Sequence, residues 1–170
     1  MTFDLLDPRN ALDPDVDGIW WAAREPLALG GMPRPRNGFP LARLAAARDV
    51  SAIVCLAGTE VVYDATALRW QGFELQDLYG ALAPADASAE WLRVTEAAVA
   101  TRELLDDGLG VIVHCAGGTG RTGTVIGAVL VSLGREPNAV AVWLDAVHKL
   151  RGRPGWPESP WQTEALRVLA

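Results

Sequence analysis

The chain has 170 residues, half of them hydrophobic, and a formal net charge of −6. This length suits one compact domain with its own core. The negative charge disfavours nucleic acid and anionic membranes as partners, because both attract clustered Lys and Arg side chains.

The two cysteines, Cys55 and Cys115, are too few for a disulfide framework, which favours a reducing compartment. The first 17 residues carry five aspartates and lack the basic and apolar regions of a secretory signal. No apolar run has the length of a bilayer span. We therefore expect a soluble, cytoplasmic protein.

Predicted strands and helices alternate along the chain. Residues 1–18 are expected to form an acidic N-terminal arm, and residues 19–170 a single domain. Apolar runs predict strands at residues 27–30, 50–56, 73–75 and 111–113. Helical patterns cover residues 41–48, the surroundings of Leu68, and residues 88–107, 122–133, 137–150 and 159 onward. This order predicts an α/β fold with a central, mostly parallel sheet and helices on both faces.

A glycine-rich loop joins the strand at 111–113 to the helix at 122–133, with Cys115 at its start and Arg121 at its end. Glycines let successive backbone N–H groups converge on one point, where an anion binds. The positive end of the following helix favours both a phosphate and a cysteine thiolate there. Arg121 is expected to hold two phosphate oxygens in a bidentate fork. The expected substrate-binding residues are Ala116, Gly117, Gly118, Thr119, Gly120 and Arg121.

Two residues beside this loop have expected supporting roles. Thr122 is expected to donate its hydroxyl to the Cys115 sulfur and so ease the breakdown of a phosphocysteine. His114, at the end of the strand, is better placed to hold the loop than to transfer protons.

The stretch VHCAGGTGRTG resembles the signature of the cysteine-dependent protein tyrosine and dual-specificity phosphatase superfamily, which is His-Cys-five residues-Arg-Ser/Thr. A weaker resemblance extends from about residue 27 to the C-terminus. It implies that Cys115 attacks phosphorus while an aspartic acid protonates the leaving oxygen, and that this aspartate then activates water. It implies neither metal nor cofactor. Phosphate, sulfate and vanadate are the expected ligands of the site.

The general acid has two candidates. In the family it lies on a loop after a strand, 30 to 40 residues before the cysteine, often among prolines. Asp77 follows Phe73 in a version of this context, although the usual prolines are missing and only Pro84 comes after it. Asp86 is the alternative, and its competing interpretation is a helix N-cap beside Ser88.

Two further residues keep two interpretations each. Gln162 resembles the family's late glutamine, which positions the hydrolytic water, but it also has the spacing of a capping-box partner for Ser159. Cys55 lies in an apolar strand and is expected in the core. The other interpretation is a reversible disulfide with Cys115 that shields the nucleophile.

Two other functions compete with that of a phosphatase. A rhodanese-type sulfurtransferase typically has a shorter loop, and a pseudophosphatase would bind phosphorylated ligands without hydrolysing them. The uncharged loop residues Ala116, Gly118 and Thr119 favour phosphotyrosine or phosphoserine/threonine of proteins as substrate. A small phosphorylated metabolite or a nucleotide is the other choice.

Overall fold

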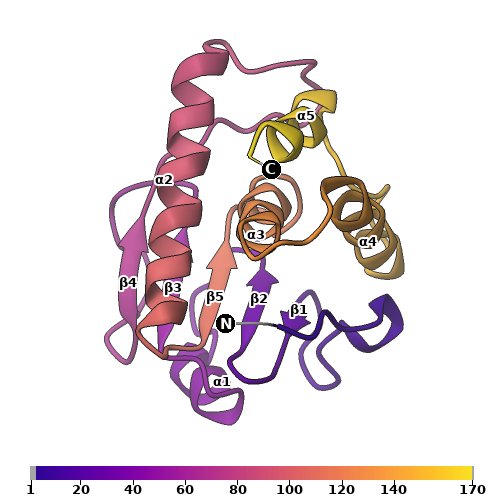
Figure 1. The fold of residues 1–170 in the computed structure, drawn as a ribbon. Coiled ribbons are helices and arrows are strands. Elements are labelled where there is room, and N and C mark those ends of the chain that lie inside the picture. The colour runs from indigo at the N-terminus through magenta and orange to yellow at the C-terminus, as the bar shows by residue number, and fades with distance from the viewer. Residues whose placement is uncertain (1–2, 170) are drawn as a thin grey trace.

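The computed structural model describes residues 3–169, which build a five-stranded sheet with helices on both faces (Figure 1). The strands run in the order β1-β2-β5-β3-β4. β1 and β2 are antiparallel, and every other neighbouring pair is parallel. The predicted α/β fold is therefore confirmed. The strands are β1 (Trp20–Ala23), β2 (Leu29–Met32), β3 (Ala52–Cys55), β4 (Arg69–Gly72) and β5 (Val111–His114).

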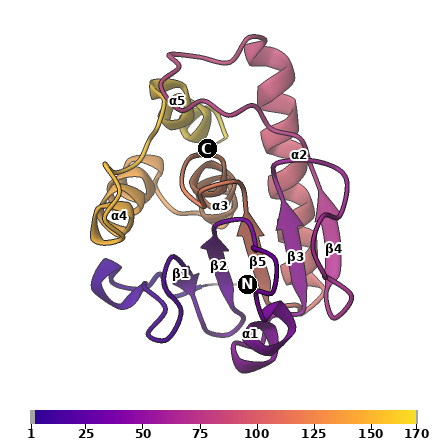
Figure 2. The same ribbon diagram turned by 180° about the vertical axis from the view of Figure 1, so that it is seen from behind.

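Alternating side chains of the strands supply two hydrophobic layers. Val111 and Val113 face the larger layer, whereas Ile112 faces the smaller one. Four helices cover the larger layer, and α1 covers the other face (Figures 1 and 2). The helices are α1 (Leu41–Ala47), α2 (Ala87–Asp106), α3 (Gly120–Ser132), α4 (Pro137–Leu150) and α5 (Pro160–Val168), with a short 3₁₀ helix η1 (Pro8–Asn10).

Helix α3 is the central helix of the larger layer. It packs against α2, α4 and α5 and against the strands β2 and β5. Gly127 permits a close approach, because a Cβ there would lie 3.0 Å from the Leu166 side chain and 3.2 Å from Leu144. Because α3 begins only six residues after β5 ends, its first turn lies near the carboxyl end of this central strand.

The acidic N-terminal segment lies against the domain. Phe3 and Ala11 are buried in the core, and Leu6 N–H donates to Ala22 O over 2.9 Å. The indole of Trp143 on α4 donates to Leu6 O.

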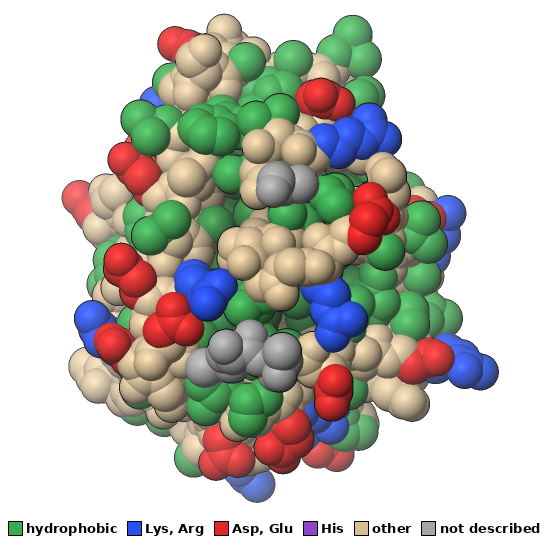
Figure 3. Space-filling view, in the orientation of Figure 1, with side chains coloured by type: hydrophobic (Ala, Val, Ile, Leu, Met, Phe, Trp, Pro, Cys, Tyr) green, Lys and Arg blue, Asp and Glu red, His purple; other side chains and the backbone are tan. Residues whose placement is uncertain are grey.

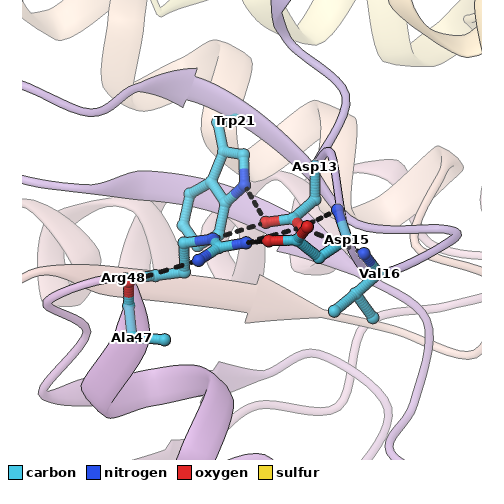
Figure 4. Close-up of polar contacts among 6 residues, drawn as sticks. All are labelled: Asp13, Asp15, Val16, Trp21, Ala47 and Arg48. Carbon is cyan, nitrogen blue, oxygen red and sulfur yellow. Dashed lines mark hydrogen bonds and ion pairs between the residues drawn. The ribbon is translucent and has the colours of Figure 1, made fainter.

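A buried carboxylate fastens this segment to α1 (Figure 4). The Asp13 side chain is fully buried and accepts hydrogen bonds from Arg48 Nε at 2.8 Å and from the Trp21 indole at 2.9 Å. It also accepts from the backbone of Asp15 and Val16. These contacts hold the pKa of Asp13 far below its usual range, against the opposing effect of burial.

Two of the elements predicted from the sequence differ from those in the structure. The helix predicted around Leu68 is wrong: a turn there, with Leu68 N–H donating to Ala65 O, leads directly into β4. The strand predicted at 73–75 lies at residues 69–72 instead, because the backbone of Arg69–Gly72 pairs in parallel with β3. Pairing with a sheet edge outweighs local helix propensity at this point. Within residues 3–169, no helix is both long and apolar enough to cross a membrane.

Candidate active site

The glycine-rich loop leaves the sheet at the carboxyl end of β5, where His114 pairs with Met32 and Cys55 on the flanking strands. Cys115 lies at the base of the loop and is buried, with 3% of its surface exposed. Among the described residues, no backbone N–H of residues 116–119 donates a hydrogen bond. These free donors and the N-terminus of α3 form a cradle for an anion directly beside the Cys115 thiol.

The carbonyl groups of the loop are bound from its outer side. The Trp20 indole donates to Gly118 O over 2.9 Å, and the Trp156 indole donates to Gly120 O over 3.3 Å. Arg151 also donates to this loop. Gly118 must be glycine, because its φ is +68° and a Cβ would lie 2.5 Å from the backbone of Met32.

The buried His114 is part of a chain of hydrogen bonds that runs through the half-buried Tyr63 and Trp70. The Trp70 indole donates to the Tyr63 hydroxyl over 3.0 Å, and that hydroxyl is 2.5 Å from His114 Nε2. On its other side, His114 Nδ1 lies 3.1 Å from Cys115 O. Because a carbonyl oxygen can only accept, His114 donates from Nδ1 to Cys115 O, and the neutral ring then accepts the Tyr63 hydroxyl proton at Nε2. Burial lowers the pKa of His114 to about 4, so the ring is neutral and suited to holding the loop.

Arg121 and Asp77 meet at the mouth of the cradle. Arg121 Nη2 lies 3.1 Å from Asp77 Oδ2, and Nη1 lies 3.4 Å from Leu75 O. Arg121 is largely buried, whereas the Asp77 side chain is 57% exposed. The loop that carries Asp77 is anchored by Gln76, whose N–H donates to the buried Glu90 and whose Oε1 accepts from Ala85 N–H.

Asp86 is placed differently from Asp77. Its Oδ1 accepts from Ala89 N–H over 2.9 Å, so it is the N-cap of α2. The structure thus brings Asp77, and not Asp86, into contact with the arginine of the loop.

Thr122 and Gln162 also adjoin the loop. The Thr122 hydroxyl is buried and has no hydrogen-bond partner among the described residues, so the expected hydrogen bond to the Cys115 sulfur is not formed here.

Gln162 Oε1 accepts from the N–H groups of Glu158 and Ser159, which completes the capping box of α5. Its Nε2 nevertheless faces Gly120, at 3.0 Å from where a Cβ would be.

Glu158 also lies at the cradle, although no sequence pattern pointed to it. A Cβ on Gly120 would be 1.9 Å from Glu158 Oε2. Burial and the nearby Asp77 raise the pKa of Glu158, while Arg121, Arg153 and the Gly120 backbone oppose that shift. The only sequence signal was its position four residues before Gln162, which is too weak to assign a role.

Cys55 is buried beside the loop in β3, and both cysteines are free thiols. Burial raises the pKa of the Cys55 thiol, which disfavours its thiolate. The two interpretations of Cys55, core residue or redox partner, both remain predictions.

A cavity of about 830 Å³ adjoins the loop at Thr119. It is lined by the exposed Tyr79 on the loop that carries Asp77, and by Trp156 on the segment between α4 and α5. Its charged lining residues are of both signs: Arg153, Asp145 and Glu158. On the face shown in Figure 3, basic and acidic side chains are likewise interspersed.

Comparison with known families gives a match over residues 31–135 to the model of Tc-R-P, described as "Polymorphic toxin system, DSP-PTPase phosphatase". No curated protein sequence matches the chain.

Solved structures with this fold include several phosphatases. Tk-PTP in its active form is 29% identical, with a TM-score of 0.56 over 84% of this chain and 90% of that one. PTPMT1 in complex with PI(5)P is 16% identical, with a TM-score of 0.66 over 90% and 94% of the two chains. TpbA (C132S) of P. aeruginosa in complex with pTyr is 15% identical, with a TM-score of 0.59 over 94% and 93%.

Proposed function

The chain belongs to the DSP-PTPase phosphatase family of polymorphic toxin systems, and we propose that it hydrolyses phosphomonoesters through a phosphocysteine at Cys115. The observation that carries this proposal is the cradle of free N–H groups with Cys115 at its base and the Arg121–Asp77 pair at its mouth. A thiol nucleophile, an anion site and an acid are thereby collected at one point.

In the first step, the Cys115 sulfur forms a bond to phosphorus as the bond to the leaving oxygen breaks. The N–H groups of the loop and the N-terminus of α3 stabilise the charge on the three remaining phosphoryl oxygens. Arg121 leaves both Leu75 O and Asp77 and turns to the phosphoryl oxygens. Asp77, released from this ion pair and protonated, gives its proton to the leaving oxygen.

In the second step, a water oxygen attacks phosphorus and the phosphorus–sulfur bond breaks. The Asp77 carboxylate takes the proton from this water, which restores the acid for the next cycle. The buried Thr122 hydroxyl has no partner among the described residues, and its proposed role is to donate a hydrogen bond to the departing Cys115 thiolate.

The cavity beside the loop supports a singly phosphorylated protein side chain as substrate. Its charged residues are Arg153, Asp145 and Glu158, a mixture that gives no site for several additional phosphates. The exposed ring of Tyr79 offers an apolar wall to a phosphotyrosine ring or a peptide. Of the structural relatives, TpbA is seen with pTyr and PTPMT1 with PI(5)P.

The test is turnover by the wild type and by Cys115→Ser in parallel. The substrates are para-nitrophenyl phosphate, phosphotyrosine and phosphoserine peptides, PI(5)P and small phosphorylated metabolites. We expect phosphate release by the wild type, fastest from a phosphopeptide, and none by Cys115→Ser. Phosphopeptide binding without turnover by the wild type would make the chain a binding module instead. Fastest turnover of a metabolite would replace the proposed substrate class.

A further inference from the structure

Arg151, at the C-cap of α4, binds the outer side of the glycine-rich loop. Its Nη1 donates to Gly118 O over 3.0 Å and to the Thr119 hydroxyl over 3.2 Å. Its Nη2 donates to Gly117 O over 3.3 Å and to Gly18 O over 2.8 Å. One guanidinium thus joins the loop, the start of the domain and the end of α4.

These contacts help to fix the direction of two peptide groups, together with the Trp20 indole, which also donates to Gly118 O, and the Thr119 hydroxyl, which lies 3.5 Å from Gly117 O. In a trans peptide the N–H points opposite to the C=O, so outward carbonyls at Gly117 and Gly118 turn the N–H groups of Gly118 and Thr119 toward the cradle. The Gly117-Gly118 peptide is the least restricted part of the loop, because neither residue has a Cβ. Without an outer partner, this peptide is free to rotate and to present a carbonyl to the anion.

The charge of Arg151 also bears on the site. Within residues 3–169, no carboxylate lies within ion-pair distance of this guanidinium. His148 Nδ1, 2.8 Å from Arg151 Nη1, is a third acceptor for the two protons of Nη1, whereas the buried Arg151 Nε has no partner among the described residues. Burial and the Arg151 charge lower the pKa of His148 to about 3, so this histidine is a neutral acceptor. Burial and the nearby Arg153 lower the pKa of Arg151 only to about 10, which leaves it charged at pH 7. A Cys115 thiolate, Asp17 and Glu158 interact favourably with this charge.

We propose that Arg151 is a positioning residue of the phosphatase: it holds the Gly117-Gly118 peptide in its anion-binding orientation, and its charge stabilises the Cys115 thiolate. This inference rests on the proposed function. Arg151 does not touch the substrate, because its donors are directed to the carbonyl side of the loop. Its two effects are separable, since one depends on the geometry of the guanidinium and the other on its charge.

The experiment compares Arg151→Lys and Arg151→Met with the wild type and with Arg102→Met, a matched loss of an arginine on the surface of α2. Vanadate affinity is measured by protection of Cys115 from iodoacetamide. The pH midpoint of Cys115 alkylation is measured without vanadate. Thermal unfolding monitors the fold of each variant.

We expect Arg151→Met to bind vanadate at least about tenfold more weakly, the order of effect for lost hydrogen bonds from a charged donor, and to shift the alkylation midpoint to higher pH. Arg151→Lys keeps the charge but loses the fork. Its alkylation midpoint should therefore stay near the wild-type pH, while its affinity for vanadate should still be lower than that of the wild type. Arg102→Met should match the wild type in both measurements.

A folded Arg151→Met protein with unchanged vanadate affinity and alkylation midpoint would overturn the proposal. If that variant does not fold, Arg151→Lys decides: vanadate affinity equal to the wild type would overturn the positioning role. Neither readout requires turnover. A wild type that binds vanadate at Cys115 but hydrolyses nothing would refute the proposed function and leave this inference standing.

Discussion

Arg121 on the first turn of α3 and Asp77 on the loop before α2 form an ion pair, with Nη2 and Oδ2 3.1 Å apart. The two residues are 44 positions apart in the sequence. Their contact brings the loop that carries the expected acid to the mouth of the anion cradle. This placement supports Asp77, rather than Asp86, as the residue that protonates the leaving group after the phosphate has drawn Arg121 away from it.

Asp77→Asn should lower kcat by roughly 10²–10⁴ on phosphotyrosine peptides or alkyl phosphates, the usual range for losing general acid catalysis. The loss should shrink on aryl phosphates whose leaving group is a weak base, because such an oxygen departs with little help from a proton. Steady-state kinetics over a series of leaving groups measures both effects.

Asp86→Asn is the matched control for this substitution. Its side chain caps α2, so its replacement should cost at most about 1 kcal/mol of unfolding free energy and leave kcat nearly unchanged. The reverse pattern, with kcat lost only in Asp86→Asn, would assign the acid to Asp86. If neither variant loses kcat, neither aspartate is the general acid.

Asp13→Asn should destabilise the fold strongly. The buried Asp13 carboxylate accepts from Arg48 and from the Trp21 indole, so loss of its charge weakens these hydrogen bonds at a cost of roughly 1.5–3 kcal/mol, although Arg48 keeps its pair with Asp15. Asp15 pairs with the same arginine but is 72% exposed, so Asp15→Asn should cost no more than about 1 kcal/mol. Urea unfolding of the two variants makes the comparison, and equal losses would contradict it.

Stability should fall as the pH is lowered from 7 to 5. Burial lowers the pKa of His114 to about 4 and, together with Arg151, that of His148 to about 3, against 6.5 for an ordinary histidine. Between pH 6.5 and 4 the unfolded chain therefore binds more protons than the folded one. In this range, each histidine lowers the free energy of unfolding by up to about 1.4 kcal/mol for every pH unit of acidification. The raised pKa of Glu158 offsets part of this.

Urea unfolding at a series of pH values measures this dependence. These are the only two histidines of the chain, so His148→Asn should remove about half of their contribution to the slope. A stability that is constant between pH 7 and 5 would show that the two rings are protonated in the folded state as readily as in the unfolded one.

Glu158→Gln should tighten the binding of inorganic phosphate at pH 8. The carboxylate adjoins Gly120 in the cradle, so its negative charge opposes an entering anion. Removing one partly screened charge should strengthen phosphate inhibition roughly two- to fivefold. The difference should narrow at lower pH, where the wild-type carboxyl takes up a proton. Glu164→Gln, on the exposed side of α5, is the control and should leave the inhibition constant unchanged.

The parts of the fold that the sequence predicts well are those with strong local signals. The apolar runs around Ile53 and Ile112 become the central parallel strands, and the capping pattern at Ser159 begins α5 as expected. The strand β1 was not predicted, since it has only four residues and two of them are alanines, which are depleted in strands. Its existence depends on pairing with β2, which is a tertiary contact.

The same limit applies to the site. The spacing of Cys115 and Arg121 is local and chemically specific, so it identifies the loop from the sequence alone. Arg151, Glu158 and Tyr63 reach the loop from other elements, through hydrogen bonds or close packing. An arginine at the end of α4 looks like a favourable charge at a helix C-terminus, and nothing in its neighbourhood indicates that it binds Gly117 and Gly118.

The most direct test of the account is to trap the reaction intermediate. Wild-type protein is mixed with para-nitrophenyl phosphate, quenched with acid during turnover, digested, and analysed by mass spectrometry. We predict one phosphoryl group on the peptide that contains Cys115, none on the peptide that contains Cys55, and loss of the adduct when vanadate is present. Sustained turnover with no phosphoryl group on Cys115, or turnover that persists in Cys115→Ser, would contradict a cysteine-dependent phosphatase.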